Sequence, residues 1–311
     1  MSLPAYPHFT LTDAAPGVHV ALAGDTGACI SNAAIIDLGD KTLIFDTFQT
    51  VTAATDLRDA AMRLTGRSAA LSVISHWHPD HTGGAQVFDD APILATARTC
   101  ELIAGDDPGD LDAYEAEIDA MLDHFRGLRE AATTDVERER IDANLKVGAL
   151  LKQEAPGYRF TVPAPIDGDG MTFEGSERRV EIVSYGPGHT ESDLFAHVPD
   201  ADLLVLGDLL WVGQHPRVND GDATAWAEVL DRIDGLGAAS LVPGHGGIGG
   251  RADGEYLAGY LRNVADIVDD ALSTGLGAEA LAAIPVPAGS EDWDSTARFY
   301  GSLTALTGSS G

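Results

Sequence analysis

The fold is decided by the stretch Ser75-His76-Trp77-His78-Pro79-Asp80-His81-Thr82-Gly83-Gly84. Three histidines and one aspartate, all of them side chains that bind metals, fall within six positions of it: His76, His78, Asp80 and His81. Residues 71–74 before this stretch, apolar except for Ser72, indicate a buried strand, and residues 82–85 after the four ligands indicate the start of a helix. We therefore expect the ligands on a loop between a strand and a helix, where open α/β sheets carry their chemistry.

The spacing of these side chains predicts two neighbouring metal positions. In an extended segment residues i and i+2 point to the same side, so His76 and His78 can converge on one cation. Pro79 fixes its own backbone angle and biases His78 toward extended geometry, and the turn that follows presents Asp80 and His81 to a second position. Imidazole with a minority of carboxylate and no thiolate favours zinc, with iron and manganese as alternatives.

The composition narrows the class of protein. The 311 residues suffice for one large domain, and we expect a single domain over residues 1–311. Asp and Glu outnumber Lys and Arg by 49 to 19, and the net charge of -30 repels phosphate backbones, which argues against a nucleic-acid partner. The sequence has no stretch typical of a membrane span or a signal peptide, so we expect a cytoplasmic protein without a membrane partner. The acidic composition fits salt adaptation or GC-rich codon bias.

Periodic patterns predict the elements on both sides of the histidines. Apolar runs at 18–22, 33–38 and 43–45 indicate antiparallel strands, and residues 50–64 indicate a helix. Apolar residues keep helical spacing from 111 to 125 and from 136 to 151, which predicts a helical insertion over about 104–155.

The insertion and the C-terminal region are both expected to be helical. Thr134 and Glu137 can form a capping box at the start of the second inserted helix. The inserted helices either cover core or form a lid over a substrate pocket, and the sequence leaves both alternatives open. Asp222 is expected to cap a later helix, and further helices are expected over about 252–308.

Three more ligand-type side chains follow near glycines at the ends of predicted strands: His189, Asp208 and His245. A carboxylate at the end of a buried strand is costly unless it is paired or binds a metal, and the alternative is a strand end open to solvent. Asp46, after the strand at 43–45, is either a carboxylate that orients a ligand histidine or a plain turn residue.

The run H-x-H-x-D-H with Gly-Gly after it resembles the signature of the metallo-β-lactamase-fold superfamily. The later motifs Gly188-His189-Thr190, Gly207-Asp208 and Gly244-His245-Gly246 appear in the order expected for it, and the resemblance covers residues 17–250. It implies an α/β fold, a four-layer αββα sandwich, into which the helical insertion is placed. It also implies a ligand set, with His76, His78 and His189 on metal one, Asp80, His81 and His245 on metal two, and Asp208 shared.

The resemblance implies a dinuclear zinc-dependent hydrolase. A hydroxide that bridges the metals would attack the carbonyl of a small-molecule ester, lactone, thioester or amide. Asp80 and Asp208 are the candidate catalytic residues, and Asp80 can also orient the hydroxide and accept its proton.

Two features select among branches of the superfamily. True metallo-β-lactamases carry no aspartate at the bridging position and are exported, so Asp208 argues against antibiotic hydrolysis. Residues 207–213 are similar to the corresponding segment of glyoxalase II-like enzymes. Residues 242–246, in contrast, depart from the usual sequence of those enzymes at that place. A β-lactamase-like activity, a single-iron dioxygenase and a non-catalytic member that binds a metal or a partner are the alternatives.

Four side chains are candidate substrate-binding residues: Tyr185, Trp211, His215 and Arg217. Tyr185 precedes His189 closely and can donate a hydrogen bond to an oxyanion, with core packing as the alternative. The other three follow Asp208 on an expected loop. Arg217 can hold a substrate carboxylate or pair with a nearby aspartate.

Overall fold

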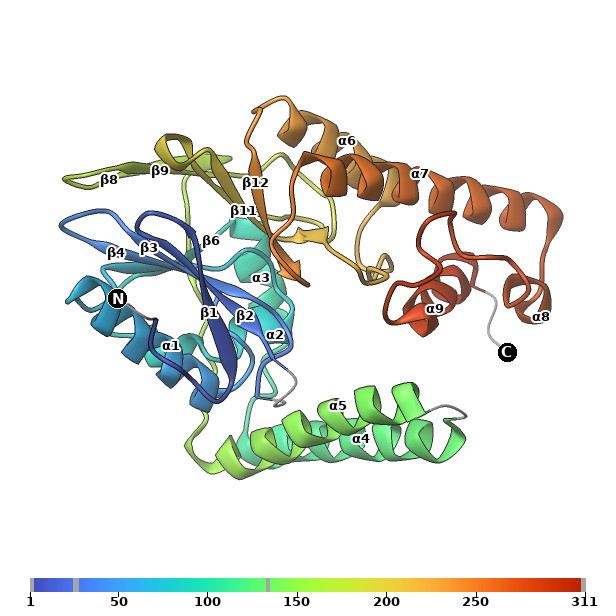
Figure 1. Ribbon diagram of the computed structural model, residues 1–311. Helices are drawn as coiled ribbons and strands as arrows, with labels where there is room; N and C mark the ends of the chain where they lie inside the picture. Colours follow the sequence, from blue (N-terminus) through green and yellow to red (C-terminus); the bar gives the residue numbers. More distant parts are fainter. Residues whose placement is uncertain (1–2, 25–27, 133–134, 309–311) are drawn as a thin grey trace. The chain divides into compact units, whose positions relative to one another are not determined.

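The computed structural model describes residues 3–24, 28–132 and 135–308 (Figure 1). The chain divides into two compact units, the first formed by Met1–Pro165 with Gly175–Glu177, and the second by Ile166–Glu174 with Arg178–Gly311. Each unit contains one β-sheet and its own apolar core. The single domain over the whole chain stays a prediction.

The first unit is built on a seven-stranded sheet whose spatial order follows the sequence. Its strands are β1 (Phe9–Ala15), β2 (Val18–Ala23), β3 (Ala33–Asp37), β4 (Thr42–Phe45), β5 (Leu71–Val73), β6 (Ile93–Ala95) and β7 (Ala164–Pro165). The strands from β1 to β4 pair antiparallel, which confirms the three strands predicted between residues 18 and 45. The strands from β4 to β7 pair parallel, so β4 and β5 both end at the edge that carries the histidines.

The helices of the first unit are α1 (Val51–Thr65), α2 (Pro79–Thr82), α3 (Ala97–Gly105), α4 (Leu111–Ala131) and α5 (Asp135–Glu154), with 3-10 turns η1 (Ala85–Phe88) and η2 (Ala155–Gly157). The predicted helix at 50–64 is α1. It begins where the Thr50 hydroxyl accepts a hydrogen bond from the backbone N–H of Ala53. Its apolar stripe of Ala53, Leu57, Ala60 and Ala61 is buried in the core of this unit, as amphipathic spacing requires.

The predicted helical insertion is a hairpin of α4 and α5, which lie side by side (Figure 1). Glu154 ends α5, and its two carboxylate oxygens accept the backbone N–H groups of Val51 and Thr52, both at 2.8 Å. These groups have no partner within α1 because they belong to its first turn, so a carboxylate is favourable there. Glu154 therefore ties the insertion to the start of α1. Thr134 lies outside the described residues, and the capping box stays a prediction.

The second unit contains a five-stranded sheet of order β12-β11-β10-β9-β8. Its strands are β8 (Gly170–Glu174), β9 (Arg179–Val183), β10 (Phe195–Val198), β11 (Leu203–Trp211) and β12 (Ser240–His245), and its helical segments are η3 (Pro199–Ala201), α6 (Ala223–Asp234), α7 (Arg251–Thr274), α8 (Ala278–Leu281) and α9 (Thr296–Thr307). The pairs from β8 to β11 are antiparallel, and β11 pairs parallel with β12. Asp222 caps α6 as predicted, because its carboxylate accepts the N–H of Ala225 at 2.8 Å.

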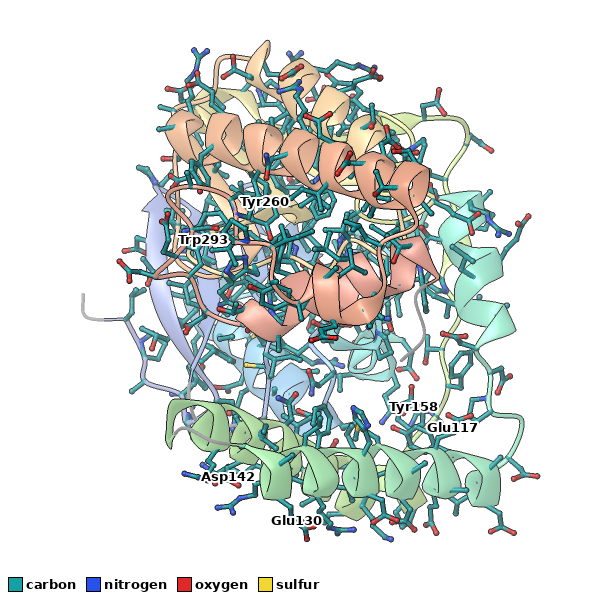
Figure 2. The ribbon with its side chains drawn as sticks, turned by 90° about the vertical axis from the view of Figure 1, so that its right-hand side faces the viewer. Glu117, Glu130, Asp142, Tyr158, Tyr260 and Trp293 are labelled. Carbon is teal, nitrogen blue, oxygen red and sulfur yellow. The ribbon has the colours of Figure 1, made fainter. Side chains whose placement is uncertain are left out.

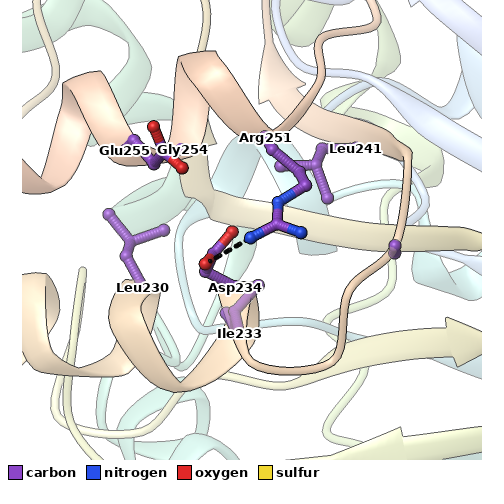
Figure 3. A pocket seen from close by; sticks show the side chains of 8 residues that line it. Leu230, Ile233, Asp234, Leu241, Arg251, Gly254 and Glu255 are labelled. Atoms are coloured by element: carbon purple, nitrogen blue, oxygen red, sulfur yellow. Dashed lines mark hydrogen bonds and ion pairs between the residues drawn. The ribbon is translucent and has the colours of Figure 1, made fainter.

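The packing between α6 and α7 is close. A void of about 10 Å³ lies among Leu230, Ile233 and Leu241, beside the 2.7 Å ion pair between Arg251 and Asp234 (Figure 3). Such a space holds at most one water molecule, so it is a packing feature rather than a ligand site.

Within the described ranges, no helix combines the length and the apolar character that crossing a bilayer requires. The cytoplasmic location and the absence of nucleic-acid and membrane partners stay predictions.

Candidate metal centre

The first unit presents four of the seven predicted ligands on one segment, residues 74–84, which we call the histidine loop. The buried strand β5 ends at Val73, and His76 and His78 follow in the loop. Asp80 and His81, however, lie on the short helix α2, and the expectation that the helix begins only after them is wrong. The helix begins at Pro79 because the fixed φ of proline suits the first helical position, where its missing N–H is not needed.

The ring nitrogens of the first pair are placed for a shared cation. His76 Nε2 and His78 Nδ1 lie 3.0 Å apart, and both rings are buried. Two nitrogens bound to one tetrahedral zinc ion, at bonds of about 2.0 Å, would be about 3.3 Å apart. In the second pair, His81 Nε2 lies 3.6 Å from Asp80 Oδ2. Both separations fit the donor spacing of a metal site.

Asp46 orients two of these histidines from the end of β4. Its carboxylate accepts the N–H of Ser75 at 2.7 Å, the Ser75 hydroxyl at 2.8 Å and the Nδ1–H of His81 at 2.8 Å. The Ser75 hydroxyl has only one hydrogen, so at 2.9 Å it accepts the Nδ1–H of His76. Both histidines therefore keep Nε2 free of its proton and able to bind a metal. Asp46 is therefore a carboxylate that orients predicted ligand histidines, and the alternative of a plain turn residue is wrong.

We expect Asp46→Asn to lower metal affinity about 10- to 100-fold, the range for carboxylates that orient ligand histidines. Asp46 has a φ of 61°, which asparagine also tolerates, so the backbone is preserved while the acceptor for His81 is weakened. Competition with a chromophoric chelator measures the affinity. The matched control is Asp222→Asn, because asparagine caps a helix as well as aspartate does. Parental affinity in Asp46→Asn would contradict the orienting role.

The second unit brings together the other three predicted ligands. Asp208 Oδ2 lies 3.2 Å from His189 Nε2, and Asp208 Oδ1 lies 3.3 Å from His245 Nε2. All three side chains are buried. Each oxygen of one carboxylate thus faces a different histidine, which is the arrangement a carboxylate needs to bridge two cations.

The local sequence explains how a carboxylate reaches this position inside a fully buried strand. The pairing of β11 with β12 shifts register between Val205 and Gly207, and Gly207 has a φ of 52°. Such a bulge re-aims the side chain that follows it, here Asp208. On β12, a Cβ at position 244 would lie 1.9 Å from Asp208 Oδ1 and 2.8 Å from the Asp208 nitrogen, so only glycine fits. Pro243 is tolerated because β12 is an edge strand.

Aromatic rings and a buried carboxylate hold the histidines of the second unit. His245 stacks on Trp211 at 3.9 Å between centroids, and His189 meets Trp226 edge-on at 5.0 Å. Asp193 accepts the Thr190 hydroxyl at 2.8 Å and fixes the residue after His189. Burial raises the pKa of Asp193 to about 7, against the hydrogen bonds from Thr190, which lower it. The sequence analysis missed Asp193, although the spacing Thr-x-x-Asp is typical of such local bonds.

The four predicted substrate-binding residues all have partners within the second unit. Trp211 is buried under His245, and the Nδ1 of fully buried His215 lies 2.9 Å from the hydroxyl of Tyr260, next to Trp293 (Figure 2). Tyr185 packs on Phe195, with the Arg232 guanidinium 3.8 Å from its ring centroid. Arg217 pairs with Asp220 at 2.9 Å. Their role in substrate binding stays a prediction.

The sequence matches the family model of the metallo-beta-lactamase superfamily over residues 26–245, a range that contains all seven predicted ligands. The chain belongs to this superfamily. The resemblance proposed from the sequence is thereby confirmed. None of the curated proteins matches the sequence.

Solved structures of the superfamily share the fold. The metallo-beta-lactamase from Pontibacter korlensis has a TM-score of 0.58 at 17% identity, covering 82% of this chain and 100% of its own. The metallo-beta-lactamase FIM-1 from Pseudomonas aeruginosa, in its mono-zinc form, has a TM-score of 0.57 at 17% identity, covering 84% of this chain and 98% of its own. The inverting sec-alkylsulfatase Pisa1 from Pseudomonas sp. has a TM-score of 0.65 at 16% identity, covering 96% of this chain and 50% of its own. The predicted α/β fold class, with its two sheets and surrounding helices, is confirmed.

Proposed function

We propose that this protein is a metal-dependent hydrolase of a small molecule, with two divalent cations, zinc before iron or manganese. The observation that carries the proposal is that the two carboxylate oxygens of Asp208 face different histidines. Asp208 Oδ2 lies 3.2 Å from His189 Nε2, and Asp208 Oδ1 lies 3.3 Å from His245 Nε2. A buried carboxylate with two histidines is costly without a cation that compensates its charge. The donor atoms on the histidine loop have spacings that fit the same role.

In this proposal the seven residues divide into two sets. His76, His78 and His189 would hold one cation, Asp80, His81 and His245 would hold the other, and Asp208 would bridge them. When bound, such cations lower the pKa of water toward about 7 and polarise a carbonyl or similar group.

In this proposal the chain's own residues orient the ligand histidines and accept a proton. Asp46 fixes the ring orientation of His81 directly and that of His76 through Ser75. The Asp80 side chain keeps 18% of its surface exposed, whereas His76 and His81 are fully buried. Asp80 is therefore the carboxylate best placed to accept a proton from an attacking water, although a carboxylate that also binds a metal is a weak base.

The substrate in this proposal is a small-molecule ester, lactone, thioester or amide. A second candidate is a sulfate ester of a secondary alcohol. It is favoured by the alkylsulfatase comparison, which covers 96% of this chain against 82–84% for the two β-lactamases. Coverage that wide requires most of the inserted and C-terminal helices to be aligned.

Metal analysis followed by a substrate panel tests the proposal. The panel contains an aryl ester, a lactone, a thioester, a cephalosporin and a secondary alkyl sulfate, each assayed with zinc, iron or manganese and after chelation. We expect hydrolysis of at least one class that chelation abolishes and added metal restores. Bound metal without turnover of any class would favour a non-catalytic member, and iron-dependent oxygen uptake would favour a dioxygenase.

A further inference from the structure

A cavity of about 490 Å³ lies in the first unit between the histidine loop and the helical insertion. This volume is within the range of small-molecule binding sites. On the histidine loop, Trp77, Pro79 and Thr82 line the cavity. In the sequence these three residues alternate with or directly follow the predicted ligands His76, His78, Asp80 and His81. The walls of the cavity come from the end of α3, from α4 and α5, and from the segment after η2, including Ile103, Ile118, Met121, Leu151 and Phe160.

Aromatic rings concentrate in this cavity. Tyr114 from α4 and Tyr158 after η2 stack at 4.4 Å between centroids, with their planes 16° apart. Trp77 meets the ring of His78 edge-on at 4.6 Å, so it contacts both the cavity and a predicted ligand. Exposed ring faces attract cations because the π-system is negative above and below the ring.

The charges around the cavity have one sign. Asp106, Asp107 and Glu117 line it, and its lining contains no lysine, arginine or histidine. In the described part of the chain, no basic side chain forms an ion pair with any of these three carboxylates. Burial, assisted by the negative charge of Asp107, raises the pKa of Tyr158 to about 12. The cavity therefore disfavours an anion and favours a cation.

A buried acceptor also lines the cavity. Gln49 is only 7% exposed, and its Oε1 has no hydrogen-bond partner among the described residues. A buried amide oxygen that lacks a partner is costly. The N–H of a protonated amine would satisfy it by a hydrogen bond, and the positive charge of a quaternary nitrogen would attract its negative partial charge. The Gln49 oxygen is an independent sign that the cavity is built for a ligand.

We propose that the cavity binds an organic cation, a quaternary or protonated amine on an apolar body, as the non-reacting end of the substrate. The apolar walls bury the body, and the rings of Trp77, Tyr114 and Tyr158 with the three carboxylates hold the charge. The assignment as part of a substrate rests on the proposed hydrolase function. The same charges disfavour an anionic substrate end.

Calorimetric titration of the full chain with benzyltrimethylammonium, before and after chelation, tests the cation site. We expect saturable binding at low ionic strength, where exposed charges are least screened, and no binding of benzylsulfonate. Glu117→Lys reverses one charge at the rim and should weaken binding about five- to tenfold. The control is Glu130→Lys, because Glu130 lies on the same helix outside the cavity lining and nearer its other end (Figure 2).

A second pair of variants tests the ring. Tyr158→Phe keeps the aromatic face and should bind as the parent does, whereas Tyr158→Leu should bind about tenfold more weakly. Equal binding of benzylsulfonate, or parental affinity in both Glu117→Lys and Tyr158→Leu, would overturn the cation site. Because this measurement needs no turnover, its failure leaves the hydrolase proposal intact.

The link to the substrate is tested by a pair of esters of nearly equal shape. An acetate ester of choline carries a quaternary nitrogen where the 3,3-dimethylbutyl ester carries a carbon. We expect kcat/KM to be about tenfold higher for the choline ester and this ratio to fall in Glu117→Lys. A ratio of one in the parent, with both esters hydrolysed, would overturn the substrate assignment alone.

Discussion

Replacing Asp208 with alanine should lower the bound metal from two ions per chain to one or none, and lower turnover more than about 100-fold. Residues that merely orient ligands contribute about 10- to 100-fold, so a direct ligand of both ions should exceed that range. The physical reason is the position of the carboxylate, whose two oxygens lie 3.2 and 3.3 Å from different histidines. Elemental analysis and steady-state kinetics on the best substrate of the panel measure the two effects.

The Asp208→Ala result must be separated from misfolding. Asp208 lies in the fully buried strand β11, so the circular dichroism spectrum and the melting temperature of the variant are compared with those of the chelated parent protein. A folded variant that keeps the parental metal stoichiometry would refute the bridging role. A folded variant that loses metal but keeps full turnover would refute the hydrolytic role of the cations.

Replacing Gly244 with alanine should also remove metal and activity, although every predicted ligand is still present. The added Cβ would lie 1.9 Å from Asp208 Oδ1 and 2.8 Å from both the nitrogen of Asp208 and the carbonyl carbon of Gly207. The carboxylate oxygen could rotate away, but the two backbone atoms cannot, so β11 and β12 must separate locally. We expect a loss of more than about 100-fold in turnover, comparable to deletion of the carboxylate, and a lower melting temperature.

Gly247→Ala is the matched control for this variant. Gly247 follows His245 in the same segment and is exposed, and a Cβ built on it meets no atom within 4 Å. This control should keep parental metal content and activity. If Gly244→Ala behaved in the same way, the close approach of β12 to Asp208 would not be needed for metal binding.

Much of the fold could be predicted because its signals are local. The helix that starts at Thr50, the cap at Asp222 and the two inserted helices follow from periodicity and capping within a few residues. The predicted start of α2 was a few residues too late. The fixed backbone angle of Pro79 suits both an extended turn and the first position of a helix, so the local sequence does not decide between them.

The identities of the seven ligand candidates were legible in the sequence because histidines and aspartates cluster at strand ends with glycines beside them. The contacts that these side chains make could not be predicted from the sequence. Asp46 and His81 are 35 positions apart, and Glu154 lies more than 100 positions from the helix start it caps. The sequence pattern records a residue's neighbours along the chain, whereas these bonds depend on which strands and helices become neighbours in space.

The sequence by itself determined the superfamily, the order of the main elements and the candidate ligands, since each follows from residue type and short-range spacing. Only the tertiary structure decided that Asp46 sets the proton positions of two histidines, that the two oxygens of Asp208 face different rings, and that the insertion encloses a cavity with an acidic, aromatic lining. The physical reason is that hydrogen-bond direction and enclosed volume arise from packing between distant segments, and no local pattern specifies them.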